Sequence, residues 1–371
     1  MSFDKILDQP TAVRTLRSAI AKSRVAHAYI FVGPAGVGRK LAAGAFARSL
    51  NCEDFREGDP CEECAGCRLI ADGRHPDVQT IKPKKRSSTI TVEQIESLLP
   101  FAHMRPLRGK VKVFVISDAD RMRMESANKL LKTLEEPPPQ TVFVLVTERP
   151  ESVLPTVASR CQPIKFGRLR TESVARILVS DFEIDPKRAD VAAELADGQV
   201  TRGLEFADPA RTGAVLGFIE SMQSLPSRMA AYDALLGFFA ERRESLQEEA
   251  EQEISDFGKE LSSSVKTSIE ETRKSFIDSH YRELLNDCLG LMLTFYRDIL
   301  VLKETRAQEL VINRNKIQLL QSHANAMSQS SIMQNMRDIE KASEYCSHFV
   351  GEDRVFMNLM LSLRDAQGAC E

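Results

Sequence analysis

The sequence predicts an α/β domain built on a parallel sheet, followed by helical regions. Three short segments rich in Val, Ile and Phe, at residues 28–33, 111–117 and 141–147, have the composition of strands that are buried on both faces. Helical patterns lie between them, and this alternation is typical of a parallel sheet with a ligand site at the carboxyl ends of its strands. From about residue 209 onward we find no strand pattern, so an all-helical region is expected there.

Two helices of the α/β domain are indicated by their residues. Val13, Leu16 and Ile20 recur at helical spacing and share one face. Thr91 and Gln94 have the spacing of a capping box, in which two side chains satisfy backbone N–H groups at a helix start. We therefore expect helices to connect the predicted strands.

A chain of 371 residues is too long for one hydrophobic core and fits two or three domains. We expect the α/β domain over residues 1–166, a small helical lid over 167–208 and a helical domain over 209–371. Asp-Pro and Asp-Gly pairs within the lid predict breaks between short helices.

Residues 241–280 combine many charged side chains, mostly acidic, with one apolar stripe. The stripe recurs at steps of three, four and seven, which predicts a single long amphipathic helix. Its members are Leu246, Ala250, Ile254, Phe257, Leu261, Val265, Ile269 and Phe276. Such a helix packs on its neighbours with a charged outer face, or forms an extended arm that pairs with a partner.

The charge balance and the cysteine distribution restrict the class of protein. The formal net charge of −3 excludes a generic polyanion binder, so any contact with nucleic acid needs a local basic patch. We find no signal peptide and no uninterrupted apolar run near the length of about 18 residues that a membrane span needs. Four of the eight cysteines lie within residues 52–67, which is typical of a metal site in a cytoplasmic protein.

Cys52, Cys61, Cys64 and Cys67 form the pattern C-x8-C-x2-C-x2-C. Four thiolates satisfy tetrahedral Zn²⁺ and leave no position for a substrate, so the pattern predicts a structural zinc site. An iron–sulfur cluster of the ferredoxin type is the alternative, but its cysteine run continues into Cys-Pro, whereas Arg68 follows Cys67 here. Disulfides are disfavoured in a cytoplasmic protein.

The segment GPAGVGRKL nearly matches the phosphate-binding P-loop, G-x-x-x-x-G-K-[ST]. Gly33, Gly36 and Gly38 preserve the loop, but Arg39 occupies the Lys position and Lys40 occupies the hydroxyl position. Lys40 brings a fixed cation to the place where Mg²⁺ is held, and Arg is not interchangeable with Lys. The favoured interpretation is a loop that only caps its helix. Nucleotide binding without turnover stays open, because the backbone amides and the helix start survive.

The acidic pair of an ATPase is incomplete as well. Ser117-Asp118-Ala119-Asp120 follows the second apolar segment, at the place where an ATPase carries a metal-binding Asp and a catalytic Glu. In one register Ser117 replaces the Asp, and in the other Ala119 replaces the Glu. We therefore expect no intrinsic ATP hydrolysis.

Arg160, in the segment Ser159-Arg160-Cys161, would by itself be a surface charge or part of an ion pair. Its sequence context changes that interpretation. The segments FDKILDQPTAVRTLRSAIAKSRVAHAYIFVGPAGVGRK, ANKLLKTLEEPPPQTVFVLVT and LPTVASRC, with the four cysteines after the first, together resemble the bacterial DNA polymerase III clamp-loader family. The resemblance covers residues 1–207, and the remainder is similar only in being helical.

The resemblance implies an AAA+ module with an inserted zinc module and a helical lid, followed by a helical collar domain. Five such subunits form an open ring that loads the sliding clamp onto primed DNA. Arg160 matches the family's arginine finger, which is aimed at the γ-phosphate of ATP in an adjacent motor subunit. Thr147 matches the position after the sensing strand, and Thr201 or Arg202 lies near the position at which the motor subunits carry a sensing Arg.

Within the family, a lost P-loop with a retained Ser-Arg-Cys segment is similar to the non-motor delta-prime subunits. The implied partners are gamma/tau-like ATPase subunits, a delta-like subunit and, through the complex, the sliding clamp and primer-template DNA. The implied assembly is a DNA-directed DNA polymerase, a nucleotidyltransferase. A divergent gamma/tau-type ATPase in which Arg39 and Asp118 suffice is the main alternative, and a zinc-binding DNA adaptor is a distant one.

Overall fold

The computed structural model describes residues 2–55, 58–83, 89–209, 213, 217, 225–255, 285–286, 288–313, 316–347 and 352–364. Contacts between residues divide the chain into two units. The first is Met1–Glu183 with Ala196–Arg202, and the second is Ile184–Leu195 with Gly203–Glu371.

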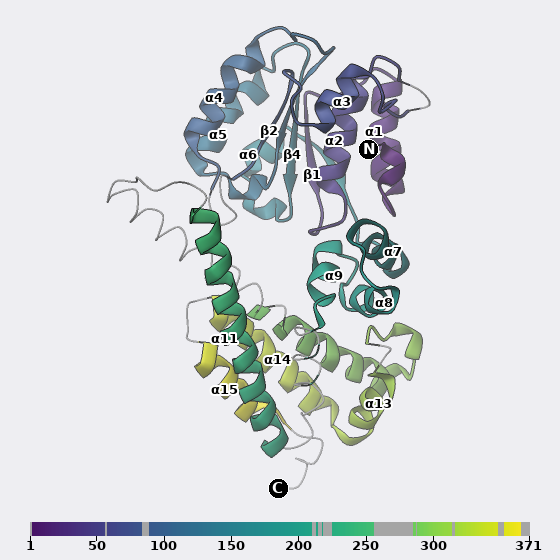
Figure 1. The fold of residues 1–371 in the computed structure, drawn as a ribbon, viewed down its shortest axis with the longest axis vertical. Coiled ribbons are helices and arrows are strands. Elements are labelled where there is room, and N and C mark those ends of the chain that lie inside the picture. The colour runs from purple at the N-terminus through teal and green to yellow at the C-terminus, as the bar shows by residue number, and fades with distance from the viewer. Residues whose placement is uncertain are drawn as a thin grey trace, which may run out of the picture. The chain divides into compact units, whose positions relative to one another are not determined.

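A five-stranded sheet forms the centre of the first unit, with the strand order β2-β3-β4-β1-β5 (Figure 1). All neighbouring strands are parallel, which confirms the predicted parallel sheet. The strands are β1 Ala28–Val32, β2 Val78–Ile81, β3 Lys112–Ile116, β4 Thr141–Thr147 and β5 Gln162–Lys165. The three inner strands, β3, β4 and β1, are the three apolar segments that the sequence predicts.

The two outer strands were not expected from the sequence, and their burial gives the reason. Three of the four residues of β2 are half-buried, and three of the four residues of β5 are exposed, so neither strand has an apolar run. β5 also contains Pro163, which lacks the N–H donor of an inner strand and is tolerated at an edge. Edge strands with one covered side need no continuous hydrophobic sequence.

Helices cover both faces of the sheet. Figure 1 shows α1, α2 and α3 on one side and α4 and α5 on the other. On the second side one core joins the strands to α4, α5 and α6, through Leu98, Leu130 and Val157 among others. The helices are α1 Pro10–Ala21, α2 Arg39–Asn51, α3 Ala65–Ala71, α4 Val92–His103, α5 Met124–Glu135, α6 Pro155–Ala158 and α7 Thr171–Phe182, with the 3-10 turns η1 Phe3–Lys5, η2 Ala119–Arg121 and η3 Pro150–Ser152.

The predicted capping box forms at the start of α4. The Gln94 side chain accepts a hydrogen bond from the Thr91 backbone N–H at 3.2 Å, and the reciprocal bond of the Thr91 side chain is also made. The two partners satisfy N–H groups that a helix start would otherwise leave without acceptors. This end of α4 is therefore fixed by local sequence.

The region predicted to be a lid contains three short helices, α7, α8 Pro186–Leu195 and α9 Val200–Phe206. The contact-based division does not keep these helices together, because α7 belongs to the first unit and α8 to the second. The three-domain division into 1–166, 167–208 and 209–371 consequently stays a prediction.

The described residues of the second unit contain helices and one 3-10 turn but no strand. Besides α8 they form α11 Leu225–Ser255, a helix over residues 288–305, α13 Ile317–Ala326, α14 Gln329–Ser347, α15 Glu352–Ser362 and the turn η5 Gln308–Leu310. Residues 241–255 of the predicted long amphipathic helix belong to α11, and residues 256–280 lie outside the described part of the chain. Among the described helices, none combines the length and the apolar composition of a membrane span.

A buried carboxylate in the middle of the helix over 288–305 holds the segment that follows this helix. Asp298 is fully buried and accepts hydrogen bonds from the Asn313 side chain at 2.7 Å and from the Ile312 and Asn313 backbone N–H groups. Arg297 pairs with the same carboxylate at 2.9 Å. A buried charge needs such partners, so Asp298 has a structural role.

We expect His323 of α13 to make the stability of the second unit dependent on pH. Burial lowers the pKa of His323, and its ring lies edge-on to Phe295 with 5.7 Å between the ring centres. Because the unfolded chain binds the proton more tightly, the free energy of unfolding should fall as the pH drops below about 6.5, by at most about 1.4 kcal/mol per pH unit. Denaturant unfolding at pH 7.5 and 5.5 should give a smaller difference for His323→Gln than for the wild type. An equal difference in both proteins would contradict this prediction.

Candidate functional site

The degenerate P-loop connects β1 to α2, and its glycines are explained by packing. A Cβ atom on Gly33 would lie 2.4 Å from the carbonyl oxygen of Phe166. Gly36 has a φ of +68°, and a Cβ atom there would lie 2.6 Å from the backbone nitrogen of Thr201. Gly38 adopts the left-handed conformation that precedes α2. Close approach of other backbone segments at Gly33 and Gly36, and the positive φ of Gly38, therefore favour glycine at this loop whether or not a phosphate binds.

Arg39, at the P-loop lysine position, is turned into an ion pair within the chain. Its side chain is only 5% exposed, and its Nη2 lies 2.9 Å from Oε1 of Glu148. Glu148 directly follows β4, the strand next to β1 in the sheet. A cation this deeply buried needs a fixed counter-charge, and Glu148 supplies it.

Lys40, at the hydroxyl position, is paired with the remnant of the acidic segment. Its Nζ lies 3.1 Å from Asp118, which follows β3. The neighbouring Asp120 accepts a hydrogen bond from the Thr147 hydroxyl at 2.9 Å and pairs with Arg149 at 3.2 Å. Both carboxylates of this segment therefore have partners within the chain.

These contacts gather the predicted nucleotide-site residues at one edge of the sheet, where β1, β3 and β4 end. The two cations that replace the P-loop Lys and Ser/Thr meet carboxylates of the same chain. A nucleotide would have to displace or compete with these pairs. The sequence did not indicate the roles of Glu148 and Arg149, although their position directly after β4 is a usable signal.

Thr201 and Arg202 lie near the start of α9. The Thr201 backbone reaches the loop at Gly36, as described, whereas Arg202 lies 4.0 Å from Asp197. Asp197 also forms an ion pair with Arg168. The correspondence of Thr201 or Arg202 to a sensing Arg stays a prediction.

Arg160 lies at the opposite edge of the sheet from the loop. It comes two residues before the start of β5, whereas the P-loop follows the end of β1, and these neighbouring strands are parallel. The edges are separated by a strand length of about 15 Å at about 3.3 Å per residue. Arg160 therefore cannot reach a phosphate held in the loop of its own chain.

The Arg160 guanidinium is held by two acceptors. Its Nη2 lies 2.6 Å from Oε1 of Glu135, the last residue of α5. Its Nη1 donates to the carbonyl oxygen of Thr156 at 2.9 Å. The side chain is 35% exposed, so the guanidinium lies at the surface in a fixed position.

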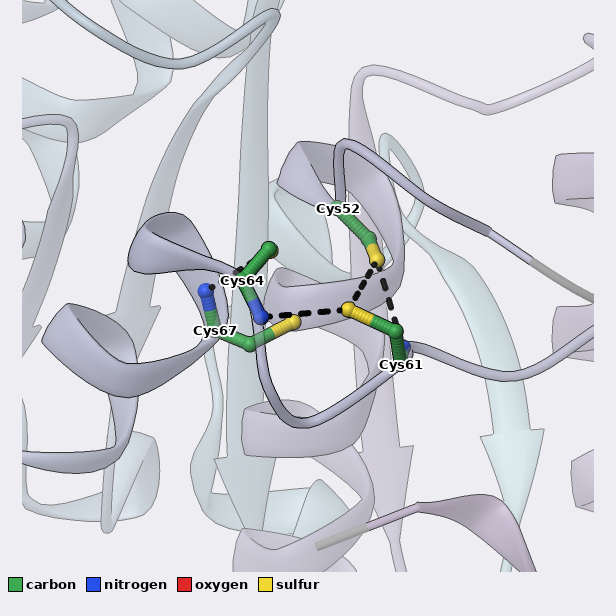
Figure 2. Close-up of side chains that lie close together, drawn as sticks. All are labelled: Cys52, Cys61, Cys64 and Cys67. Atoms are coloured by element: carbon green, nitrogen blue, oxygen red, sulfur yellow. Dashed lines mark hydrogen bonds between the residues drawn. The ribbon is translucent and has the colours of Figure 1, made fainter.

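The four predicted metal ligands lie together at the junction of α2 and α3, with Cys67 in the first turn of α3 (Figure 2). The sulfur atoms of Cys52, Cys61, Cys64 and Cys67 all lie within 4.8 Å of one another, and those of Cys52 and Cys61 are 3.5 Å apart. Tetrahedral zinc with Zn–S distances of about 2.3 Å would place its sulfurs about 3.8 Å apart. The cluster fits one tetrahedral ion with small adjustments.

Backbone donors prepare part of this cluster for a thiolate. The Cys64 N–H donates to Cys61 Sγ at 3.3 Å, and this bond is the main reason that the pKa of Cys61 is lowered to about 7. Burial raises the pKa of Cys52 and of Cys67. Without a cation two of the thiols are thus held neutral, and a bound dication would reverse this by stabilising the thiolates.

The first ligand is also tied to the loop before β3. Lys110 donates from Nζ to the Cys52 carbonyl oxygen at 2.6 Å, and the Asn51 side chain accepts from the Lys110 and Val111 N–H groups. These hydrogen bonds attach the cysteine cluster to the sheet. Loss of the cluster would therefore disturb more than its own loop.

Comparison with known proteins adds sequence evidence. The family model described as DNA polymerase III, delta subunit matches residues 8–170. The subunit delta' of DNA polymerase III from Bacillus subtilis (strain 168) is 35% identical over 205 residues, which cover 54% of this chain and 61% of its own length. Residues 8–170 belong to the clamp-loader family of DNA polymerase III. The family prediction is confirmed.

The relatives do not separate the subunit types of the clamp loader. Subunit tau of DNA polymerase III from the same Bacillus strain is 31% identical over 213 residues, which cover 56% of this chain and 37% of its own length. The chain thus matches less than two thirds of either relative. A solved gamma subunit-related protein of DNA polymerase III from Thermotoga maritima aligns with 95% of this chain and 98% of its own at 16% identity, with a TM-score of 0.41.

Proposed function

We propose that this chain is a non-motor, delta-prime-like subunit of the DNA polymerase III clamp loader. In this role it supports ATP-dependent loading of the sliding clamp on primed DNA without hydrolysing ATP itself. Its catalytic contribution is Arg160, an arginine finger supplied to the ATP site of a neighbouring gamma/tau-like subunit. The chain would work in the cytoplasm as part of a ring that also contains a delta-like subunit.

The position of Arg160 is the observation that carries the proposal. The residue lies at the amino-terminal edge of the sheet, away from the loop of its own chain, and its guanidinium is fixed at the surface. Arginine suits this task because its planar fork can bind two phosphate oxygens and stays charged. An arginine that cannot act on its own chain can act only on a neighbour.

The second part of the proposal is that the P-loop has a structural role. Arg39 pairs with Glu148 and Lys40 with Asp118, so the groups that would bind the β/γ-phosphates and Mg²⁺ are replaced by internal ion pairs. The loop then serves to pack β1, Phe166 and Thr201 against one another. The ATP that concerns this chain is bound by its neighbour.

A titration calorimetry experiment tests this part. When Mg-ATP is titrated into the isolated chain, we expect no binding heat from a site of micromolar affinity, and we expect no release of phosphate over time. The same measurements on a gamma/tau-type subunit should show the binding heat and the release of phosphate. A micromolar site in the isolated chain would overturn the structural role of the loop.

We also propose that the cysteine cluster holds one structural zinc ion. Cys52, Cys61, Cys64 and Cys67 would provide a closed set of four thiolates, and the ion would supply cross-linking without substrate chemistry. The proposal includes a zinc module, an AAA+ lid and a helical collar, and it is supported by the family resemblance together with the helices described above.

A divergent gamma/tau-type ATPase is the second candidate, favoured only by the match to subunit tau. It requires Arg39 and Asp118 to bind ATP and metal, although each is engaged in an ion pair within the chain. Turnover by the purified chain that is lost in Arg39→Ala would favour this candidate.

A further inference from the structure

Arg160 forms an ion pair with a residue that the sequence did not indicate as its partner. The Glu135 carboxylate lies 2.6 Å from Nη2 of Arg160 through Oε1, and the residues are 25 positions apart in the chain. Both side chains are accessible, with 35% of Arg160 and 49% of Glu135 exposed. An isolated surface ion pair contributes little to stability, so a stabilising role does not explain this contact well.

The two elements that carry the pair are rigidly joined. Glu135 ends α5 next to Leu134, and Arg160 lies between α6 and β5 next to Cys161. Leu134, Val157 and Cys161 are buried in the same hydrophobic core. The backbone on both sides of the contact is therefore fixed, and only the guanidinium stem could move.

Two acceptors then fix the guanidinium itself. Glu135 holds Nη2, and the Thr156 carbonyl oxygen accepts from Nη1 at 2.9 Å. A guanidinium has five N–H donors, so these two bonds leave three for an incoming phosphate. The arrangement fixes the orientation of the guanidinium and leaves N–H donors free to bind a phosphate.

We propose that Glu135 is a positioning residue that pre-orients Arg160 for the phosphate of a neighbouring subunit. The inference rests on the proposed trans role of Arg160 and adds the device that prepares it. A flexible arginine would lose side-chain entropy on each encounter with the phosphate, whereas a pre-oriented one has lost it already. The acceptor oxygen of Glu135 matters for this role more than its charge.

The test is ATP turnover by the reconstituted clamp loader in which only this subunit is altered. The difference between wild type and Arg160→Ala defines the contribution of the finger. A misplacement of about 1 Å can reduce a rate by on the order of 10²-fold, and because Thr156 still holds one N–H we expect Glu135→Ala to reduce the rate at the facing site about tenfold. Glu135→Ala should therefore lose about nine-tenths of the difference in turnover between the wild type and Arg160→Ala, and its KM for ATP should be unchanged.

Three controls distinguish positioning from a general structural effect. Glu135→Gln keeps an acceptor oxygen and should retain most of the turnover. Glu136→Ala removes the adjacent carboxylate and should have no effect. In the Arg160→Ala background, Glu135→Ala should cause no further loss, because the group that it positions is absent.

Several results would overturn the inference. Increased turnover with Glu135→Ala would mean that Glu135 masks Arg160, and an equal loss with and without Arg160 would mean a structural role. A large loss with Arg160→Ala but none with Glu135→Ala would refute the positioning role alone. No loss with Arg160→Ala would refute the proposed trans role, and the positioning role with it.

Discussion

Replacement of Arg160 by Ala is expected to depress ATP turnover and clamp loading by the reconstituted complex while leaving assembly intact. An arginine finger supplied in trans contributes about 10³–10⁵ in rate in GTPases. In a ring with several ATP sites only the site facing this subunit would lose that contribution, so total turnover should fall less steeply. Arg160→Lys should rescue little, because an ammonium on a flexible stem lacks the planar fork.

The control for this experiment is Arg170→Ala. Arg170 is also an exposed arginine of the first unit and forms a similar ion pair, 2.8 Å from Asp8. Its removal should leave turnover at the wild-type level. If the Arg160→Ala complex keeps full ATP turnover and clamp loading, Arg160 is a surface arginine without a catalytic role.

Loss of the proposed zinc ion is the change with the second largest expected effect. Purified chain should contain one zinc ion, and Cys64→Ser should lose it and unfold at a lower temperature. Apparent zinc-binding free energies in small structural sites are about 10–16 kcal/mol, and part of this is folding free energy, so a loss of several kcal/mol is expected. The damage should spread to the sheet through Lys110 and Asn51, which tie the cluster to the start of β3.

Cys161→Ala provides a control for the zinc experiment. Cys161 is buried outside the cluster, and burial raises the pKa of its thiol to about 12, which disfavours metal binding. This variant should keep full zinc content even if the core is destabilised. Iron in place of zinc, or protein free of metal after gentle purification, would contradict the assignment.

The inner strands and the cysteine cluster could be predicted because their signals are local. β1, β3 and β4 are buried on both faces and therefore need continuous apolar runs, whereas the edge strands β2 and β5 need none. The four cysteines lie close in sequence, so their spacing alone indicated that they meet.

The ion pairs could not be predicted because they depend on strand order. Arg39 and Glu148 are 109 residues apart, and Lys40 and Asp118 are 78 residues apart. They meet because β1, β4 and β3 are neighbours and end at one edge of the sheet. The sequence indicated that the P-loop had lost its catalytic groups, and the fold provides the partners of the residues that replaced them.

The most direct test of the account is phosphate release in a mixture of this chain with gamma/tau-type and delta-like clamp-loader subunits. The chain alone should release no phosphate, and its addition should raise turnover by the motor subunits until the complex is saturated. Arg39→Ala should leave this stimulation unchanged, and Arg160→Ala should remove most of it. Phosphate release by the chain alone that is abolished by Arg39→Ala would contradict the account and identify a motor subunit instead.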